Sequence, residues 1–228
     1  MIQKNIEEIL SYLQSFENEA NRKGMARYGI NTEKAFGVGM SILKPFAKTI
    51  GKDHPTALRL WDTGWHEARL LAGLIAEPDK ADDALLERWV NEIDSWDICD
   101  LLCKYFITKT LCVSDKIILW TTRDHEFTKR AGFVLMAEHA IHAKNMDNEA
   151  FMPYLTIIER EAADNRNFVK KAINWALRQM GKRNKALHVQ ALMCAERLLV
   201  VNSPSARWIA RDAIRELNSD AVKKKIYR

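Results

Sequence analysis

The sequence predicts an all-α protein, a curved α-α superhelix (solenoid) of stacked antiparallel helical hairpins. Three observations support this prediction. Apolar residues recur with the 3.6-residue period of amphipathic helices, and no segment shows the two-residue alternation of a strand. The periodic segments are mostly about 12 to 20 residues long with short links, so neighbouring helices should run antiparallel. From residue 80 onward they pair into units of about 35 residues, which is typical of repeat stacks.

The N-terminal section is the least regular part of this pattern. Residues 4–16 predict a helix, because isoleucine and leucine recur on one face of it. Residues 20–40 contain several glycines and predict a long connector. Ser41 is the candidate N-cap of a helix that ends before Gly51. We therefore expect residues 1–53 to be a less regular section of a single repeat domain that covers residues 1–228.

The rest of the chain reads as consecutive helices. A short helix opens at His54-Pro55 and ends within residues 61–64. The later helices are expected over residues 65–76, 80–93, 95–108, 114–121, 124–143, 148–163, 166–182, 185–200 and 204–218. The C-terminal run KKKIYR, residues 223–228, reads as the frayed end of a helix.

Composition limits the function classes. The chain is 47% hydrophobic, yet no segment approaches the roughly 20 apolar residues of a membrane span, and its charged N-terminus has no cleavage site. The four cysteines offer no CxxC pairing for disulfides or zinc. His139 and His142 lie three apart on a helix but have no third metal ligand nearby. We expect a cytoplasmic monomer, not bound to a membrane, that uses no metal and no cofactor.

Charge is unevenly distributed along the chain. Residues 1–114 hold 14 Lys+Arg against 17 Asp+Glu, a net charge of −3, and residues 115–228 hold 21 against 13, a net charge of +8. The positive field therefore belongs to the C-terminal half. Such an asymmetry favours a nucleic-acid partner, although Lys/Arg runs also occur as ordinary solvated surface.

The strongest basic stretch is residues 165–195, which contain no acidic residue. Within its first helix an apolar stripe predicts the core face, and Trp175 lies about a third of a turn away from that stripe. A tryptophan among cations suits a polyanion that carries bases or sugars. Alternatively, Trp175 fills a seam against a neighbouring helix and the cations are only solvated. The cations of this stretch that are candidate DNA contacts are Lys170, Lys171, Arg178, Lys182 and Arg183.

A second stretch, DSWDICDLLCKY, residues 94–105, contains residue types that are suited to catalysis. Trp96 and Asp100 are four apart and share a helix face that differs from the apolar stripe. Asp94 and Asp97 are explained as first-turn acids, with Asp94 a candidate N-cap. Asp100 lies beyond the first turn in a helix that is apolar nearly all round, so it needs a specific role.

Several motifs together resemble the AlkD-like DNA alkylation repair proteins, a family of HEAT-like repeat DNA glycosylases. The resemblance covers roughly residues 35–217. The motifs, in order, are FGVGMSILKPFAKTIG (36–51), LW (60–61), HEAR (66–69), WDICD (96–100), KRAGF (129–133) and VKKAINWALRQMGKR (169–183). The resemblance implies a HEAT/ARM-like fold. It also implies that Trp96, Asp100 and Trp175 serve catalysis and that Arg130, with Lys129 beside it, contacts DNA.

Two functions follow as expectations. The first is an N-glycosylase that excises cationic N3- or N7-alkylated purines from double-stranded DNA. Asp100 would stabilise the oxocarbenium-like sugar and position water, and the π faces of Trp96 and Trp175 would each contribute about 0.5–2 kcal/mol toward a cation. The alternative, because the resemblance extends to paralogues that bind DNA without excising a base, is a non-catalytic repeat protein for branched or damaged DNA. A protein-binding solenoid is a more distant reading.

Overall fold

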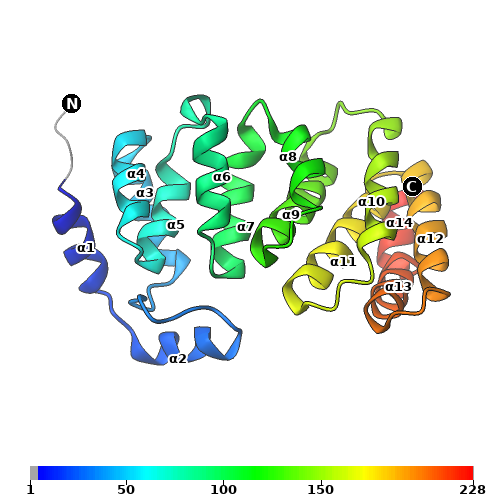
Figure 1. The fold of residues 1–228 in the computed structure, drawn as a ribbon, viewed down its shortest axis with the longest axis horizontal. Helices are drawn as coiled ribbons and strands as arrows, with labels where there is room; N and C mark the ends of the chain where they lie inside the picture. The colour runs from blue at the N-terminus through cyan, green and yellow to red at the C-terminus, as the bar shows by residue number, and fades with distance from the viewer. Residues whose placement is uncertain (1–4, 228) are drawn as a thin grey trace. The chain divides into compact units, whose positions relative to one another are not determined.

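A computed structural model describes residues 5–227, and within that range the chain is helical and contains no strand. The all-α prediction is confirmed. Contacts between residues divide the chain into two compact units, Met1–Cys112 and Val113–Arg228, which are described separately below (Figure 1). This boundary lies two residues before the one used above to compare net charges. Because those two residues, Val113 and Ser114, are uncharged, the net charges of −3 and +8 apply to units 1 and 2.

Unit 1 consists of seven α-helices and two short 3-10 turns among its described residues. They are α1 (Ile6–Gln14), α2 (Glu19–Arg27), α3 (Met40–Ile50), α4 (His54–Asp62), α5 (His66–Ile75), η1 (Pro78–Lys80), α6 (Asp83–Asn91), α7 (Trp96–Tyr105) and η2 (Ile107–Lys109). Helix α5 packs against α3, α4 and α7. Aspartate side chains cap two of these helices, since Asp53 accepts from the Thr56 N–H at 3.1 Å and Asp82 accepts from the Leu85 N–H at 2.7 Å.

Aromatic side chains form much of the core of unit 1. The rings of Trp61 and Trp89 stack with centroids 4.4 Å apart, and Phe106 lies 5.3 Å beyond Trp89. All three side chains are completely buried. Such pairs add about 0.5–1.5 kcal/mol each beyond the burial of their area. This core fixes α4 and α6 and the end of α7, and so positions the remainder of α7.

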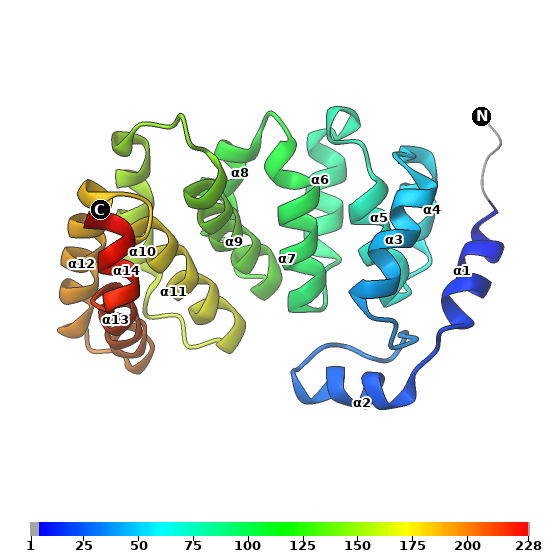
Figure 2. The ribbon, with the colours of Figure 1, turned by 180° about the vertical axis from the view of Figure 1, so that it is seen from behind.

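The predicted connector over residues 20–40 was wrong in part, because its first third forms helix α2. Asn18 caps this helix by accepting from the Asn21 N–H at 2.9 Å. The helix buries none of its side chains completely, so it has no apolar stripe that sequence periodicity could detect. In Figures 1 and 2 it runs across the direction of the other helices of the unit. Lys4, the expected start of α1, lies outside the described residues.

Unit 2 contains the remaining helices of the described chain. They are α8 (Val113–Trp120), α9 (Glu126–His142), η3 (Asn148–Phe151), α10 (Met152–Glu161), α11 (Asn167–Gly181), α12 (Lys185–Leu199), α13 (Pro204–Leu217) and α14 (Asp220–Tyr227). Helices α9, α11 and α13 pack side by side as one layer, and α10 packs against α12 in a second layer. Successive helices therefore alternate between layers, as expected for stacked antiparallel hairpins.

The core of unit 2 follows the predicted pattern closely. The predicted apolar stripe of α11 is completely or almost completely buried; its members are Val169, Ala172, Ile173, Ala176 and Met180. Trp175 is only half-buried. The helix thus presents its apolar face to the core and carries Trp175 on another face, as its periodicity predicted.

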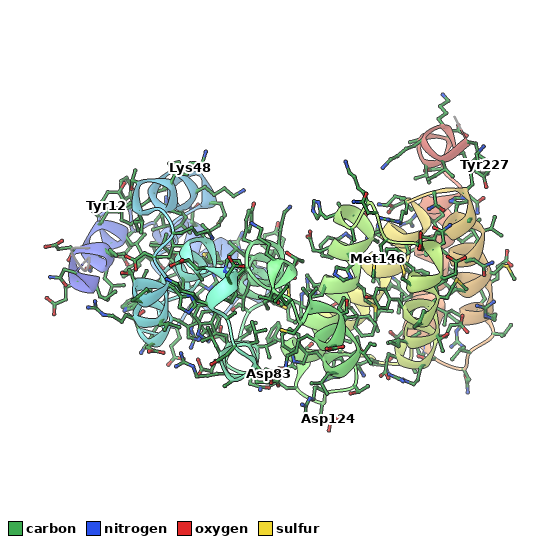
Figure 3. All side chains as sticks on the ribbon, turned by 90° about the horizontal axis from the view of Figure 1, so that it is seen from above. Tyr12, Lys48, Asp83, Asp124, Met146 and Tyr227 are labelled. Carbon is green, nitrogen blue, oxygen red and sulfur yellow. The ribbon has the colours of Figure 1, made fainter. Side chains whose placement is uncertain are left out.

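Two further features differ from the sequence prediction. Residues 223–227 are not a frayed end, because they belong to a separate helix, α14, which buries Val222 and Ile226. Tyr227 at its end lies at the surface of unit 2, as Tyr12 and Lys48 do in unit 1 (Figure 3). At the start of α3, Gly39 rather than Ser41 is the N-cap residue, and it makes no side-chain cap. No helix in the described range is long and apolar enough to cross a membrane.

Candidate active site and nucleic-acid surface

A cavity of about 620 Å³ in unit 1 lies against α7. Helix α2 and the loop before α3 supply most of its apolar wall. Residues of that wall include Met25, Ile30, Val38, Met40, Leu70 and Leu101. The polar side chains of the cavity come mainly from α7, which contributes Trp96, Asp97 and Asp100. An indole and two carboxylates therefore border one predominantly apolar space.

Trp96 and Asp100 share a wall of this cavity because they are four residues apart on α7. The intervening Ile98 and the following Leu101 are buried in the core. Trp96 is half-buried, and its Nε1–H donates to the backbone oxygen of Tyr28 at 3.1 Å. Asp100 is also half-buried. The geometry of this pair agrees with the spacing argument, and the ring of Trp96 is held in place by the segment after α2.

Asp97 has a different environment from Asp100. Its Oδ2 lies 2.9 Å from Nε2 of the buried His66, and its Oδ1 accepts from the Ile98 N–H at 3.0 Å. Burial by itself would lower the pKa of His66, but the hydrogen bond and the charge of Asp97, with smaller contributions from Glu67 and Asp94, outweigh it and raise the pKa. Both carboxylate oxygens of Asp97 are therefore engaged, one of them with an imidazole that favours the protonated form.

Glu67, next to His66, fixes the loop on the opposite wall. Its completely buried carboxylate accepts from three successive backbone N–H groups, of Phe36 at 2.9 Å, Gly37 at 2.7 Å and Val38 at 3.0 Å. Gly37 has a φ of +79°, and a Cβ there would lie 2.3 Å from the backbone oxygen of Asn18. Glycine is thus required at this position. Sequence reasoning missed Glu67 and His66, although both lie in the motif HEAR.

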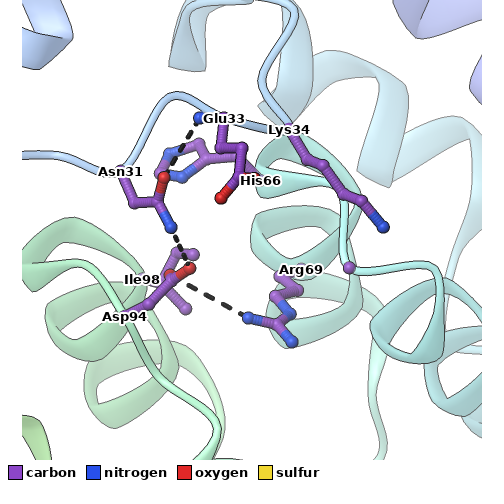
Figure 4. Close-up of a pocket in the computed structure, with 8 residues that line it drawn as sticks. Asn31, Glu33, Lys34, His66, Arg69, Asp94 and Ile98 are labelled. Atoms are coloured by element: carbon purple, nitrogen blue, oxygen red, sulfur yellow. Dashed lines mark hydrogen bonds and ion pairs between the residues drawn. The ribbon is translucent and has the colours of Figure 1, made fainter.

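A smaller polar pocket of about 230 Å³ lies at the N-terminus of α7 (Figure 4). Asn31 donates from Nδ2 to Asp94 Oδ2 at 2.8 Å, and its backbone N–H donates to the Ser95 hydroxyl at 2.9 Å. Arg69 donates to the backbone oxygen of Glu92 at 3.0 Å and lies 3.9 Å from Asp94. Ser95, not Asp94, is the N-cap residue, which corrects the sequence interpretation. These contacts tie the start of α7 to α5 and to the loop after α2.

Unit 2 carries the basic stretch, and its exposed part is centred on α11. Lys171 is exposed, and Trp175 lies one turn further along the helix. The Nε1 of Trp175 is 2.8 Å from the Gln179 amide when that amide presents its oxygen. The indole therefore bonds within its own helix and keeps part of its ring open. We call Lys171, Trp175 and Arg178 the α11 face.

Two predicted DNA contacts at the C-terminal end of α11 are neutralised in part by acids of α13. Arg178 pairs with Glu216 and lies 3.8 Å from Asp212. Lys182 pairs with Glu216 at 2.6 Å. Both cations are half-buried, so a phosphate would have to compete with these carboxylates for them. Lys170, in contrast, lies with its Nζ 5.4 Å from the centroid of the Trp208 ring.

Three other predicted DNA contacts are engaged by carboxylates or backbone oxygens of unit 2 itself. Lys129 is buried and pairs with Glu161 at 2.6 Å and Asp164 at 3.1 Å. Arg130 is buried and donates to the backbone oxygen of Phe168 at 2.6 Å. Arg183 donates to backbone oxygens at the end of α9 and in the loop after it, including that of Ala140 at 3.0 Å.

The Asp164 carboxylate beside Lys129 is stabilised in its charged form. Burial alone would raise the pKa of Asp164, but hydrogen bonds from Arg166 and Lys129 outweigh it and lower the pKa to about 2. A cation held in this way braces α9 against the end of α10 and is not presented to a ligand. Periodicity could not reveal this, because a basic residue near a helix start reads as surface.

Among the described residues, no group of three or more His, Cys, Asp or Glu could hold a metal ion.

The sequence profile of a family described as DNA alkylation repair enzyme matches residues 9–217 of the chain. The chain belongs to this family of DNA alkylation repair enzymes. The match includes α7 with Trp96 and Asp100, and α11 with Trp175. Family membership agrees with the resemblance inferred from the motifs.

A solved structure shares the fold. It is described as representing a new family of proteins related to the HEAT-like repeat DNA glycosylases with affinity for branched DNA structures. The two chains superpose with a TM-score of 0.80 at 20% sequence identity, over 93% of this chain and 95% of the other. At this identity the likeness establishes the HEAT-like fold of the alkylation repair chain and nothing about its ligand. None of the curated proteins is similar enough to the chain to count as a match.

Proposed function

We propose that this DNA alkylation repair family member is an N-glycosylase that removes cationic N3- or N7-alkylated purines from double-stranded DNA. The observation that carries the proposal is the pair formed by Trp96 and Asp100 on one wall of the cavity in unit 1. An indole face and a carboxylate are the groups that suit a positive charge, first on the alkylated base and then on the sugar.

The chemistry requires little more than positioning and one negative charge. An alkylated purine already carries a positive charge, so the C1′–N bond breaks with both electrons moving to the base, which leaves as a neutral molecule. Positive charge then develops on the deoxyribose. Asp100 stabilises this oxocarbenium-like sugar and orients a water molecule, whose oxygen bonds to C1′ and whose proton passes to solvent. The products are the free base and an abasic site.

Asp100 is a better candidate than Asp97 for this role. Asp97 is held by His66 and by the Ile98 N–H, so its charge is compensated by an imidazole that tends to be protonated. These contacts give Asp97 a structural role in holding α7 against α5. Asp100 lies one turn further along the same helix, on the face that bears Trp96. We assign Asp97 and His66 to positioning α7.

We further propose that unit 2 contributes DNA contacts through the α11 face. Lys171 is exposed and suits a phosphate, and Trp175 keeps part of its ring open for a nucleotide. Arg178 can exchange Glu216 for a phosphate at the edge of the same face. Lys129, Arg130 and Arg183 are not included in the proposed contact set, because each is engaged inside the unit.

A second candidate function is non-catalytic binding of branched or damaged DNA. It is favoured by the affinity for branched DNA structures of the family to which the structurally similar chain belongs. Base release separates the two candidates. Methylated duplex DNA is incubated with the full chain, and free 7-methylguanine and 3-methyladenine are quantified after subtraction of spontaneous loss. Release above the uncatalysed rate supports the glycosylase; binding without release supports the alternative.

A further inference from the structure

Helix α13 carries an aromatic and basic surface that the proposed function does not use. It borders a pocket of about 480 Å³, lined by Pro204, Arg207, Trp208, Arg211, Asp212 and Arg215. Trp208 is 40% exposed, while its neighbours Ile209 and Ala210 are completely buried. Part of the ring is therefore open to solvent, beside the arginines that line the pocket. We call Trp208, Arg211 and Arg215 the α13 face.

The α13 face lies on the same side of unit 2 as the α11 face. Helices α11 and α13 pack side by side in one layer, and the ammonium group of Lys170 lies 5.4 Å from the centroid of the Trp208 ring. Counted from the N-cap residues Arg166 and Ser203, Trp208 is at the position in α13 that Lys171 has in α11. Equivalent positions of stacked hairpins face the same way.

The two faces continue one another further along the helices. By the same count, Arg215 occupies the position in α13 that Arg178 has in α11. Arg178 reaches across to Asp212 and Glu216 of α13, which confirms that these turns are adjacent. A ligand that contacts Lys171 and Arg178 and continues past α11 would meet Trp208 and Arg215 next.

The charge of the α13 face is positive and partly uncompensated. Arg211 is exposed, and its guanidinium makes no hydrogen bond or ion pair with another residue of the described range. Arg215 pairs with Asp212, but that carboxylate also lies 3.8 Å from Arg178 and accepts from the Asn174 amide at 2.6 Å, so it is shared among several partners. Exposed single apolar residues are common on proteins, but a tryptophan surrounded by arginines is a combination enriched where a partner binds.

We propose that the α13 face binds the sugar-phosphate backbone of duplex DNA and extends the contact of the α11 face by one hairpin. This inference rests on the proposed DNA-binding function. Two rows of cations on helices about 8–10 Å apart match an extended ligand with regularly spaced negative charge. An indole between them covers the apolar surface of a deoxyribose or an unpaired base. An acidic protein could satisfy the charges, but it does not require the open ring.

The test measures binding of the full chain to an undamaged, fluorescein-labelled DNA duplex by anisotropy at several salt concentrations. Arg211→Ala should reduce the slope of log affinity against log salt by about 0.9, the value for one lost phosphate contact. Trp208→Ala should weaken binding on the order of tenfold with little change of slope, since it removes an apolar contact. Trp208→Phe should retain most of the affinity and guards against a folding defect.

Matched controls lie on α12, in the other layer of the unit. Arg197→Ala removes an exposed arginine and Met193→Ala removes an exposed apolar side chain, and neither should change affinity or slope. If Trp208→Ala and Arg211→Ala bind like wild type while Lys171→Ala binds more weakly, the α13 inference is wrong and the proposed function stands. The inference is also wrong if the controls weaken binding equally. If the wild-type chain binds no DNA, both proposals fail.

Discussion

Replacement of Asp100 by asparagine separates catalysis from binding. The substitution keeps the size of the side chain and removes its negative charge. Asp100 is half-buried on a largely apolar cavity wall, where an effective dielectric constant near 20 is appropriate. At about 4 Å from a developing sugar cation, the lost attraction is about 4 kcal/mol as an upper value. Base release should therefore fall by a factor on the order of 10²–10³.

The assay is single-turnover release of 7-methylguanine from methylated duplex DNA, with spontaneous depurination subtracted. Binding of undamaged DNA by Asp100→Asn should stay constant or tighten, because a negative charge is removed from a site near phosphates. Asp97→Asn is the matched control: it makes the same chemical change one turn away, where the carboxylate pairs with His66. It should affect stability more than the chemical step. Release at the wild-type rate by Asp100→Asn would refute the assignment and direct attention to Asp97.

Three further predictions concern stability and DNA contact. Since the folded-state pKa of His66 is raised above its ordinary 6.5, stability from its pair with Asp97 is complete below about pH 6.5 and is lost as pH rises through the folded pKa. Asp97→Asn should flatten this part of a denaturation-versus-pH profile. Gly37→Ala should destabilise the chain by about 2–4 kcal/mol in urea unfolding, because its Cβ would meet a backbone oxygen at 2.3 Å. Gly24→Ala, with no atom within 4 Å of the new Cβ, should instead stabilise it by about 0.5–1 kcal/mol. Lys171→Ala should weaken binding of damaged and undamaged duplexes alike and lower the salt slope by about 0.9.

Each of these predictions has a result that contradicts it. An unchanged pH profile in Asp97→Asn would show that the His66 pair does not govern the loss of stability above about pH 6.5. Equal stabilities of the Gly37→Ala and Gly24→Ala variants would remove the argument for a fixed loop. Lys129→Ala is the control for Lys171→Ala: it should lower stability by about 1.5–3 kcal/mol, because it removes one of the cations that pair with Glu161 and Asp164, and should leave the salt slope unchanged. A change of slope there would return Lys129 to the DNA contacts.

The sequence by itself determined the fold class and the faces of individual helices. Periodicity placed the core stripe of α11 correctly, and it separated Trp175 from that stripe. The four-residue spacing put Trp96 and Asp100 on one face of α7. These features are local, because a helix fixes the relative directions of its own side chains without reference to the rest of the chain. The change in net charge between the two units was also readable, since charge is a property of composition.

Only the tertiary structure decided which polar residues are engaged and by what. Lys129 and Lys171 look alike in sequence, yet one is buried between two carboxylates and the other is exposed. Only the structure shows that Glu67 holds the loop at Gly37, 30 residues earlier in the chain, by accepting hydrogen bonds from its backbone. Helix α2 has no apolar stripe and was missed. In each case the deciding partner lies far along the chain or on another helix, and periodicity within one segment carries no information about contacts made between segments.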